Sequence, residues 1–537
     1  MNIYEILDLY SGEYIKDNTL FIICFILFTF IYYILEVVGI GFILSKLNNK
    51  INQQYVIYFL VLSFVLVVFT YIRGYLESKL SSDIATFSRK KFFKGLLQKY
   101  KTNYQDLNIG NSINRIFAVT LEYRFAVINF FKLTLPCIFV LILTTGIILK
   151  INFKIGLLLL ACLFVAILIT CREYKIINSH KISQEKFFYN SFNSLTDQVN
   201  NLMNSYLNNE NKNEQNKIED DQDKYKEKVF NAENSVNYIN TYLMFNLMVF
   251  LSFIIYFFYK NKMSDKVFFV VVLIYFVSNY ITLSKEMGIL IPHLGISAAS
   301  SDYFKKLLEN NDSGKIKNIK NGNIEFKNVS FGYNNNKILN KLCFNIKNKS
   351  KVAIIGRSGS GKTTLTKLIL KLYNDYDGTI YLGGQNIKNI DTDYLRQKVV
   401  YINQRTNLLE ISVIDNINYG NHVNKQVIIE LLKKYDLLQI FQGLKNGIYE
   451  ICSVGGNNLS LGMQKVIILT RGILKSKNSN LMIFDEPLAG LDANTRQKVI
   501  KMIMNECNNN TLLIITHDEE IIPYMDTTLN LQNINKK

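Results

Sequence analysis

The chain has 537 residues, a hydrophobic fraction of 49% and a formal net charge of +18. This length allows two or three domains, and the hydrophobic fraction is high for a soluble protein. The positive charge raises the question of nucleic acid binding, but no motif that reads RNA or DNA is found, so we expect no nucleic acid partner.

Long apolar runs fill residues 20–300. A helix that crosses a bilayer needs about 20 mostly apolar residues, and six segments meet or approach that length. They cover residues 20–45, 55–76, 126–149, 153–171, 240–259 and 267–290. We therefore predict an all-α membrane domain over residues 1–310, with six spans in a lipid bilayer.

The connections between these spans alternate between short and long. Those at 46–54, 150–152 and 260–266 are short, whereas those near 77–125 and 172–239 are long and polar. Between Arg73 and Lys132 there are 11 Lys and Arg residues against 4 Asp and Glu residues. Because basic loops resist translocation, we predict cytoplasmic long loops and cytoplasmic termini. The Asn-rich stretch 207–228 is predicted to be the tip of a helical hairpin.

Glu36 is an ionisable residue within the first apolar segment. Such a group usually faces a cavity or a partner; alternatively, it lies near the outer interface and extends its carboxyl group towards water. Both interpretations stay open. The aromatic side chains of the spans either line a pocket for an apolar substrate or face lipid and neighbouring helices; they are Phe28, Phe30, Tyr32, Tyr33, Phe276 and Tyr280.

After a linker at 311–322, the pattern changes to short β-rich runs separated by helical stretches. Strand-like runs occur at 324–331, 351–356, 379–384, 398–403, 480–487 and 511–518. This alternation predicts an α/β domain over residues 323–537, built on a mixed, largely parallel sheet.

The stretch KVAIIGRSGSGKTTL (351–365) contains G-x-x-x-x-G-K-T between an apolar strand and a helical run. In this motif, backbone N–H groups and the positive end of the helix hold phosphate oxygens. Lys362 is expected to reach the β- and γ-phosphates of ATP, and the Thr363 hydroxyl to bind Mg²⁺. The candidate phosphate-binding residues are Gly356, Arg357, Ser358, Gly359, Ser360, Gly361, Lys362, Thr363 and Thr364.

LMIFDEP (481–487) is a buried strand that ends in two carboxylates. Asp485 is expected to hold Mg²⁺, and Glu486 to polarise the attacking water. His517 follows the next apolar strand, where its imidazole could bond the γ-phosphate. An acidic pair after a strand and a lone histidine are each common in structural positions. Their occurrence together with the phosphate-binding motif favours a catalytic role for both.

In this order, the motifs resemble those of the ATP-binding cassette (ABC) superfamily, and in particular exporters that fuse six membrane helices to one P-loop NTPase nucleotide-binding domain. The resemblance implies that Tyr333 of VSFGY stacks on adenine. It implies that Gln404 senses the γ-phosphate and joins the Mg²⁺ ligands, that Asp492 of AGLD belongs to the D-loop, and that His517 is the switch histidine.

The stretch LSLGM (459–463) occupies the place of the family's signature, whose usual form is LSGGQ. The chain keeps Ser460 and Gly462 but has Leu461 and Met463. Backbone N–H donors survive a side-chain replacement, so the start of the following helix can still bind an anion. We predict a degenerate but functional signature. Two further departures are Val454 in place of a glutamate and Lys349 in place of a glycine.

The resemblance implies a second half-transporter subunit, because the phosphate cradle and the signature of one domain face different directions. Two ATP molecules would then lie between two subunits, in a homodimer or in a heterodimer with unequal sites. ATP binding and hydrolysis would drive export of an unidentified substrate of amphipathic, lipid- or peptide-like character, by alternating access. The alternatives are a membrane protein whose cassette only gates or regulates, and a soluble ATPase merely anchored to the membrane.

Overall fold

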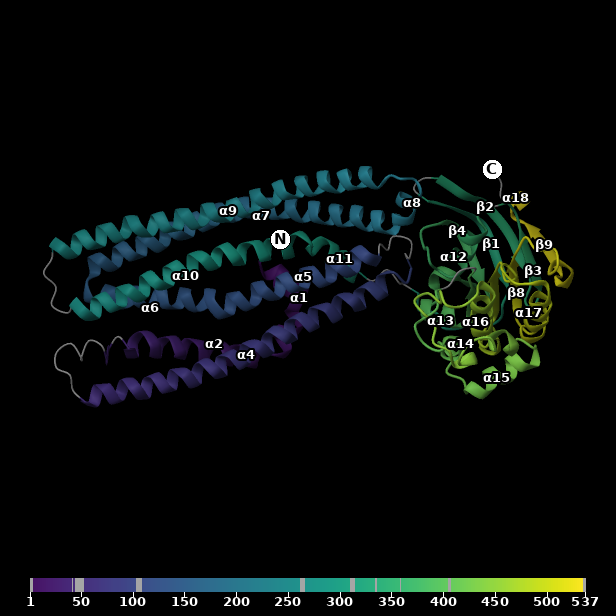
Figure 1. Cartoon of the computed structure of the whole chain (residues 1–537), viewed down its shortest axis with the longest axis horizontal. Coiled ribbons are helices and arrows are strands. Elements are labelled where there is room, and N and C mark those ends of the chain that lie inside the picture. Colours follow the sequence, from purple (N-terminus) through teal and green to yellow (C-terminus); the bar gives the residue numbers. More distant parts are fainter. Residues whose placement is uncertain are drawn as a thin grey trace. The chain divides into compact units, whose positions relative to one another are not determined.

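The computed structural model describes residues 3–40, 42–43, 53–102, 109–260, 266–309, 314–333, 336–357, 359–403 and 407–534. Its contacts divide the chain into two compact units, Met1–Leu96 with Asn108–Glu309 and Leu97–Leu107 with Asn310–Lys537. The first unit is helical and the second is α/β (Figure 1).

Long helices make up the first unit. They are α1 (Ile3–Asp17), α2 (Thr19–Ile34), α4 (Gln53–Lys99), α5 (Ile109–Asn129), α6 (Leu135–Ile151), α7 (Phe153–Asn200), α8 (Leu202–Leu207), α9 (Asn211–Lys260), α10 (Lys266–Ala299) and α11 (Ser301–Leu308). A π-helical turn, η1 (Leu35–Gly39), continues α2, and a second, η3 (Phe130–Thr134), joins α5 to α6.

Six helical stretches in the described part of the chain are long and apolar enough to cross a membrane. They are Thr19–Gly39, Gln53–Lys99, Ser112–Ile151, Phe153–Asn200, Asn211–Phe257 and Phe268–Ala299. Each coincides with one predicted span, although residue 41 and residues 44–45 of the first lie outside the described residues. Several of these helices continue well beyond the apolar part.

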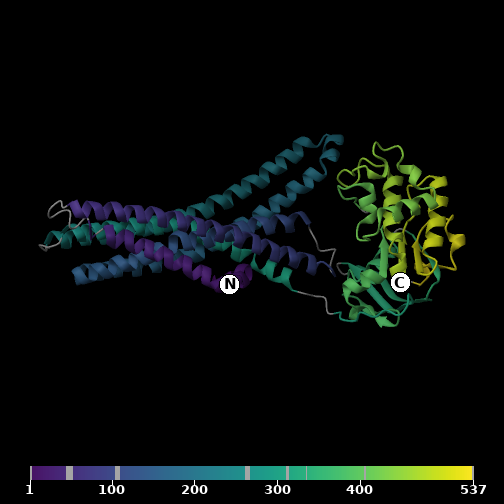
Figure 2. The same ribbon diagram turned by 90° about the horizontal axis from the view of Figure 1, so that it is seen from below.

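The two longest helices form the predicted hairpin. α7 and α9 lie side by side along their length in both views (Figures 1 and 2). The short helix α8 and a turn that contains Asn209, with a φ of 59°, join them. The Asn-rich stretch is therefore the start of α9 together with this turn, as predicted. Buried apolar side chains from α6, α7, α9 and α10 hold the bundle together, among them Leu159, Leu247 and Phe276.

The second unit contains nine strands within its described residues. They are β1 (Ile324–Tyr333), β2 (Asn336–Ile346), β3 (Lys351–Ile355), β4 (Asp377–Leu382), β5 (Gln385–Asn386), β6 (Val399–Ile402), β7 (Leu481–Asp485), β8 (Thr511–Ile515) and β9 (Thr527–Asn530). The helices between them are α12 (Lys362–Ile369), α13 (Thr392–Lys398), α14 (Val413–Asn418), α15 (Lys425–Lys434), α16 (Leu461–Ile473), α17 (Ala493–Glu506) and α18 (Leu531–Ile534).

These strands form two sheets, and the expectation of one mixed sheet is wrong in this respect. The parallel sheet has the order β6-β7-β8-β3-β9, and the antiparallel sheet has the order β2-β1-β4-β5. Strands β1 and β2 pair as an antiparallel hairpin, which needs no helical crossover connection. Both strands therefore belong to the antiparallel sheet. Strand β2 was not predicted, because Lys and Asn interrupt its apolar residues.

Apolar side chains cover both faces of the parallel sheet. Along β7, Met482 and Phe484 belong to one buried cluster, whereas Leu481 and Ile483 belong to another. This alternation follows from the two-residue period of a strand. Helices therefore cover both faces, and the functional groups emerge at the ends of the strands.

Candidate functional site

Neighbouring strands of the parallel sheet carry the candidate residues to one edge. β3 ends at Ile355 and leads into the Gly-rich turn, β7 ends at Asp485, and β8 ends at Ile515, two residues before His517. Because the three strands are parallel, their carboxyl ends meet at the same edge of the sheet. The topology therefore brings together residues that are 155 positions apart, such as Lys362 and His517.

The Gly-rich turn uses glycine where another residue would be strained. Gly359 and Gly361 have φ values of 79° and 95°, in the left-handed region. A Cβ at Gly361 would lie 2.7 Å from Leu339 Cδ2, whereas a Cβ at Gly359 would meet no atom within 4 Å. Space is thus left beside Gly359, at the N-terminus of α12, where backbone N–H groups attract anions. Ser358 lies outside the described residues.

Lys362 extends its ammonium group into this turn. Its Nζ donates to the carbonyl oxygens of Gly356, at 2.5 Å, and Arg357, at 3.2 Å, and lies 3.0 Å from His517 Nε2. Burial lowers the pKa of Lys362, and the negative charges of Glu486 and Asp485 oppose this change. The cation, the imidazole and both carboxylates therefore belong to one cluster.

Asp485 is buried, with an exposed fraction of 6%. Burial raises the pKa of its carboxyl group, while a hydrogen bond from Tyr401 and the charges of Lys465 and Lys362 oppose this change. The Tyr401 hydroxyl donates to Asp485 Oδ2 at 2.9 Å. Sequence reasoning missed both Tyr401 and Lys465. Lys465 gave a signal, because it is the one charged residue in the apolar run KVIIL of α16.

Glu486 follows Asp485 in an unusual backbone conformation. Its φ is 48°, which is rare for a residue with a side chain and typical of functional sites. Its backbone N–H donates to Ile515 O at 2.9 Å, which fixes the turn against β8. The carboxylate oxygen Oε1 lies 3.9 Å from His517 Nε2. The structure thus places Glu486 and His517 beside the Gly-rich turn.

The residues present fit a magnesium ion that also binds phosphate. Mg²⁺ prefers hard oxygen ligands and keeps water and phosphate in its shell, so it needs few protein groups. Thr363 is exposed in the first turn of α12, and Asp485 supplies a carboxylate. Within the described residues there is no cluster of three or more His, Cys, Asp or Glu side chains for a closed metal site. Gln404, the third candidate, lies outside the described residues.

Tyr333 lies next to α12. Its hydroxyl is 3.3 Å from the Thr364 hydroxyl, and its ring packs edge-on against Tyr373 at 5.7 Å and Phe331 at 5.1 Å. Tyr333 is therefore close to the Gly-rich turn, in agreement with a position at one end of a nucleotide site. Ser360 completes the turn by donating its backbone N–H to Arg357 O at 3.1 Å.

Ser460, Gly462 and Asp492 are held by other elements. Ser460 caps α16, because its hydroxyl accepts the Met463 N–H at 3.2 Å, and Asp492 caps α17 by accepting the Thr495 N–H at 3.1 Å. A Cβ at Gly462 would lie 3.8 Å from Gly490 O, so the two caps are neighbours. Among the described residues, no hydrogen bond or ion pair joins these three residues to the cluster around Lys362.

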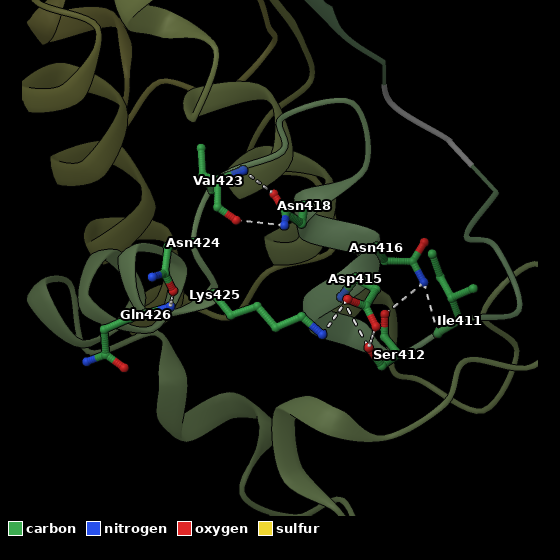
Figure 3. Close-up of polar contacts among 9 residues, drawn as sticks. All are labelled: Ile411, Ser412, Asp415, Asn416, Asn418, Val423, Asn424, Lys425 and Gln426. Atoms are coloured by element: carbon green, nitrogen blue, oxygen red, sulfur yellow. Dashed lines mark hydrogen bonds and ion pairs between the residues drawn. The ribbon is translucent and has the colours of Figure 1, made fainter.

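The segment that follows Gln404 is fixed by polar contacts (Figure 3). Ser412 caps α14 by accepting the Asp415 N–H at 3.2 Å, and Asp415 Oδ1 pairs with Lys425 at 2.7 Å. Asn416 Nδ2 donates to the carbonyl oxygens of Ile411 and Ser412, and Asn416 receives hydrogen bonds from Arg471 of α16. These bonds hold α14 against α16, the helix that the signature begins.

Residues 339–489 match the protein family described as ABC transporter. This match runs from strand β2 to the residues that follow β7, so it covers part of the α/β unit. The chain is 34% identical over 201 residues to the multidrug resistance-like ATP-binding protein MdlB of Buchnera aphidicola subsp. Schizaphis graminum. It is 33% identical over 226 residues to the ATP-dependent lipid A-core flippase of Saccharophagus degradans.

These matches cover 37% and 41% of this chain, and they span 34% and 38% of the two relatives' own lengths. A solved structure of a bacterial Atm1-family ABC exporter with ATP bound covers far more. It matches 96% of this chain and 94% of its own, with a TM-score of 0.84 and 17% sequence identity. The predicted fold class, a six-helix membrane domain followed by an α/β nucleotide-binding domain, is confirmed.

The structure shows the surroundings of three residues that depart from the pattern of the family that the chain resembles. Lys349 has a φ of 62° and donates its N–H to Thr511 Oγ1 at 2.9 Å. A glycine adopts this left-handed conformation without strain, so the position carries a small backbone cost in this chain. Val454 is 71% exposed and Leu461 is 73% exposed, so both replacements leave apolar groups at the surface around the signature.

Lys465 should give this protein a pH-dependent stability. It is 4% exposed, and burial lowers its pKa from 10.5 to about 8. The negative charges of Asp485 and Glu486 oppose this change. A change of that size corresponds to about 3 kcal/mol. Between pH 8 and 10.5 the unfolded chain binds the extra proton, so this lysine's contribution to the free energy of unfolding rises with pH.

We therefore expect the melting temperature of wild type, relative to Lys465→Met, to rise as the pH goes from 7.5 to 10. The full-length protein can be followed by thermal unfolding at several pH values. Lys501→Met, at an exposed position of α17, is the control and should differ from wild type by a constant amount. A constant difference for Lys465→Met as well would contradict the burial argument.

Proposed function

We propose that the chain is one half of an ATP-driven exporter, which hydrolyses ATP between two subunits and moves a substrate across a bilayer. The observation that carries this proposal is the convergence of Lys362, Asp485, Glu486 and His517 at one sheet edge. The same chain has six helices suited to a membrane. Because the curated relatives match little more than a third of their own lengths, the activity of the whole protein is part of this proposal.

In this proposal the Gly-rich turn binds the phosphates of ATP, and Lys362 stabilises the charge on the β- and γ-phosphates. Glu486 accepts a proton from the attacking water, and His517 holds the γ-phosphate in position. Tyr333 stacks on adenine. Thr363, Asp485 and Gln404 hold Mg²⁺, which supplies charge neutralisation when it is bound. The remaining phosphate-binding residues are Gly356, Arg357, Ser358, Gly359, Ser360, Gly361 and Thr364.

Ser460, Gly462 and Asp492 are proposed to serve the ATP held by a second subunit. Their separation from the cluster around Lys362 supports this assignment, since they cannot complete that cluster in their present positions. Two copies of this chain would give two equal sites. A heterodimer with a different half-transporter is the alternative, and the unusual signature would then lie at one site only.

The chain is a multi-pass membrane protein by its six helices and its exporter fold. We propose that residues 1–310 form the membrane domain, residues 311–322 a linker, and residues 323–537 a cytoplasmic nucleotide-binding domain with both termini on the same side. A cavity of about 300 Å³ between α6, α7, α9 and α10 supports an apolar or amphipathic substrate. Its lining includes Ile138, Leu163, Leu243 and Met287.

A second candidate function is a membrane protein whose cassette binds ATP to gate or regulate without pumping. The exposed Leu461 and Val454 favour it, because both stand where the family usually has residues that bind phosphate or contact the membrane domain. The two functions differ in turnover. An exporter hydrolyses ATP continuously and moves substrate against a gradient, whereas a gate needs only ATP binding.

The deciding experiment uses purified full-length protein reconstituted in proteoliposomes. ATP added outside, where the nucleotide-binding domains of half of the molecules lie, should be hydrolysed and should drive the uptake of an amphipathic dye. Glu486→Gln protein in the same lipid is the matched control. Binding of ATP without hydrolysis in wild type would reject the exporter and support the gate.

Substitutions in the signature test whether its backbone donors matter more than its side chains. We expect Leu461→Gly to change the ATPase rate by less than about threefold, because the N–H groups at the start of α16 are unchanged. Ser460→Ala removes the cap on Met463 N–H and should lower both the ATPase rate and the stability of α16, by about 1 kcal/mol. A large gain in rate for Leu461→Gly would instead identify the leucine as the defect that limits turnover.

A further inference from the structure

Two charged residues lie within the apolar part of the first two spans. Glu36 is the only charged residue from Thr19 to Ile40, and Arg73 is the first charged residue of α4 after Gln53. α2 and α4 run antiparallel: Lys79 lies over the Phe21 ring at 5.1 Å, and a Cβ at Gly39 would lie 2.9 Å from Leu62. Both charges therefore lie between apolar stretches of the same helix pair.

Arg73 is surrounded by tyrosines. Its guanidinium donates to the Tyr33 hydroxyl at 3.3 Å, and its Cζ lies 4.9 Å from the centre of the Tyr32 ring and 5.7 Å from that of Tyr33. A guanidinium has five N–H donors, so the one hydrogen bond that Arg73 makes among the described residues leaves most of them available.

Glu36 lies in the π-helical turn η1 that ends α2. Single π-helical turns often occur at functional sites. The carboxylate lies within electrostatic range of Arg73 and of Tyr275 on α10. Among the described residues, however, neither of its oxygens makes a hydrogen bond or an ion pair. The two opposite charges are thus close but not in contact.

A charge in a membrane-spanning segment is energetically costly, and direct pairing with an opposite charge would reduce that cost. Glu36 and Arg73 do not pair directly, and the side chains around them are half-buried and aromatic. A ligand group placed between Glu36 and Arg73 can satisfy both if it carries an anion for the guanidinium and an ammonium for the carboxylate. The rings of Tyr32, Tyr33 and Tyr275 can also bind an ammonium through their faces.

We propose that Glu36 and Arg73, with Tyr32, Tyr33 and Tyr275, form an intramembrane site for the zwitterionic head group of a lipid-like amphiphile. The ligand class is a single molecule with one phosphate or carboxylate, one ammonium and an acyl chain that remains among the apolar helices. This inference rests on the proposed function, because the ligand is taken to be the transported substrate.

The test measures equilibrium binding to full-length protein in a nonionic maltoside detergent without nucleotide. The probes are lysophosphatidylethanolamine, which is zwitterionic, lysophosphatidylglycerol, which is anionic, and hexadecylamine, which is cationic. We expect wild type to bind the zwitterion at least about tenfold more tightly than either singly charged probe. Equal binding of all three probes to wild type would overturn the proposal without any variant.

Variants then assign the selectivity to residues. Glu36→Gln should remove the preference for the zwitterion over the anionic probe, and Arg73→Gln the preference over the cationic probe. The exchanged pair Glu36→Arg with Arg73→Glu should regain the preference that each single change loses. Ser63→Ala is the control, because the Ser63 hydroxyl on α4 bonds only to Phe59 O of its own helix.

If the single variants weaken all three probes equally, the pair is a structural feature of the helix packing and the proposal is wrong. ATP hydrolysis, measured on the same preparations, separates this proposal from the proposed function. Selective binding without hydrolysis would reject the exporter alone, whereas hydrolysis without selective binding would reject the head-group site alone.

Discussion

Glu486→Gln should lower the ATP turnover rate by about 10²- to 10⁴-fold, the usual contribution of a general base. The carboxylate lies 3.9 Å from His517 at the edge of the parallel sheet, and its backbone φ of 48° directs it away from the regular path of β7. The amide retains the size of the side chain but cannot take a proton from water. Binding of ATP should therefore persist, since Lys362 and the Gly-rich turn are unchanged.

Two measurements on the full-length protein test this expectation: the rate of phosphate release, and the amount of ATP retained after gel filtration. Glu410→Gln, an exposed carboxylate of the same unit, is the matched control and should keep the wild-type rate. Turnover within tenfold of wild type in the Glu486→Gln protein would place the general base elsewhere.

Lys362→Ala should weaken ATP binding by about ten- to a hundredfold. The ammonium lies at the Gly-rich turn, with donated bonds to Gly356 O and Arg357 O. A hydrogen bond to a charged phosphate contributes about 1.5–3 kcal/mol, and a factor of ten corresponds to about 1.4 kcal/mol. Hydrolysis should fall even at saturating ATP, because the same cation stabilises charge on the transferred phosphate.

Titration with a fluorescent ATP analogue, with and without Mg²⁺, measures this loss. Lys367→Ala, on the same helix α12 but outside the turn, should bind the analogue like wild type. If Lys362→Ala and Lys367→Ala bind equally well, the phosphates do not lie in the Gly-rich turn and the proposed nucleotide site is wrong.

Much of the α/β unit could be predicted because its information is local. The runs that became β3, β7 and β8 are short, apolar and bounded by glycine or charge, and the segments that follow them carry Lys362, Glu486 and His517. Parallel order then places Lys362, Glu486 and His517 at one edge. Strand β2 was missed because Lys and Asn occupy exposed positions along it and interrupt its apolar residues.

Tyr401 and Lys465 illustrate what a sequence alone does not reveal. The tyrosine is 84 residues from Asp485, and only the pairing of β6 with β7 brings its hydroxyl to the carboxylate. The lysine belongs to a helix whose other side chains are apolar, and only the packing of α16 places it beside the acidic pair. The open pair of Glu36 and Arg73 likewise depends on how α2 and α4 align.

α16 links two places that have different tasks in the proposed dimer. Its N-cap, Ser460, belongs to the surface that would face the second subunit. Lys465 follows five residues later, about 7.5 Å along the helix axis. Over that length a helix behaves as a stiff rod. A displacement of the N-terminus of α16 must therefore either bend the helix or move the ammonium of Lys465 relative to Asp485. A change at the ATP bound by one subunit would in this way alter the site of the other subunit.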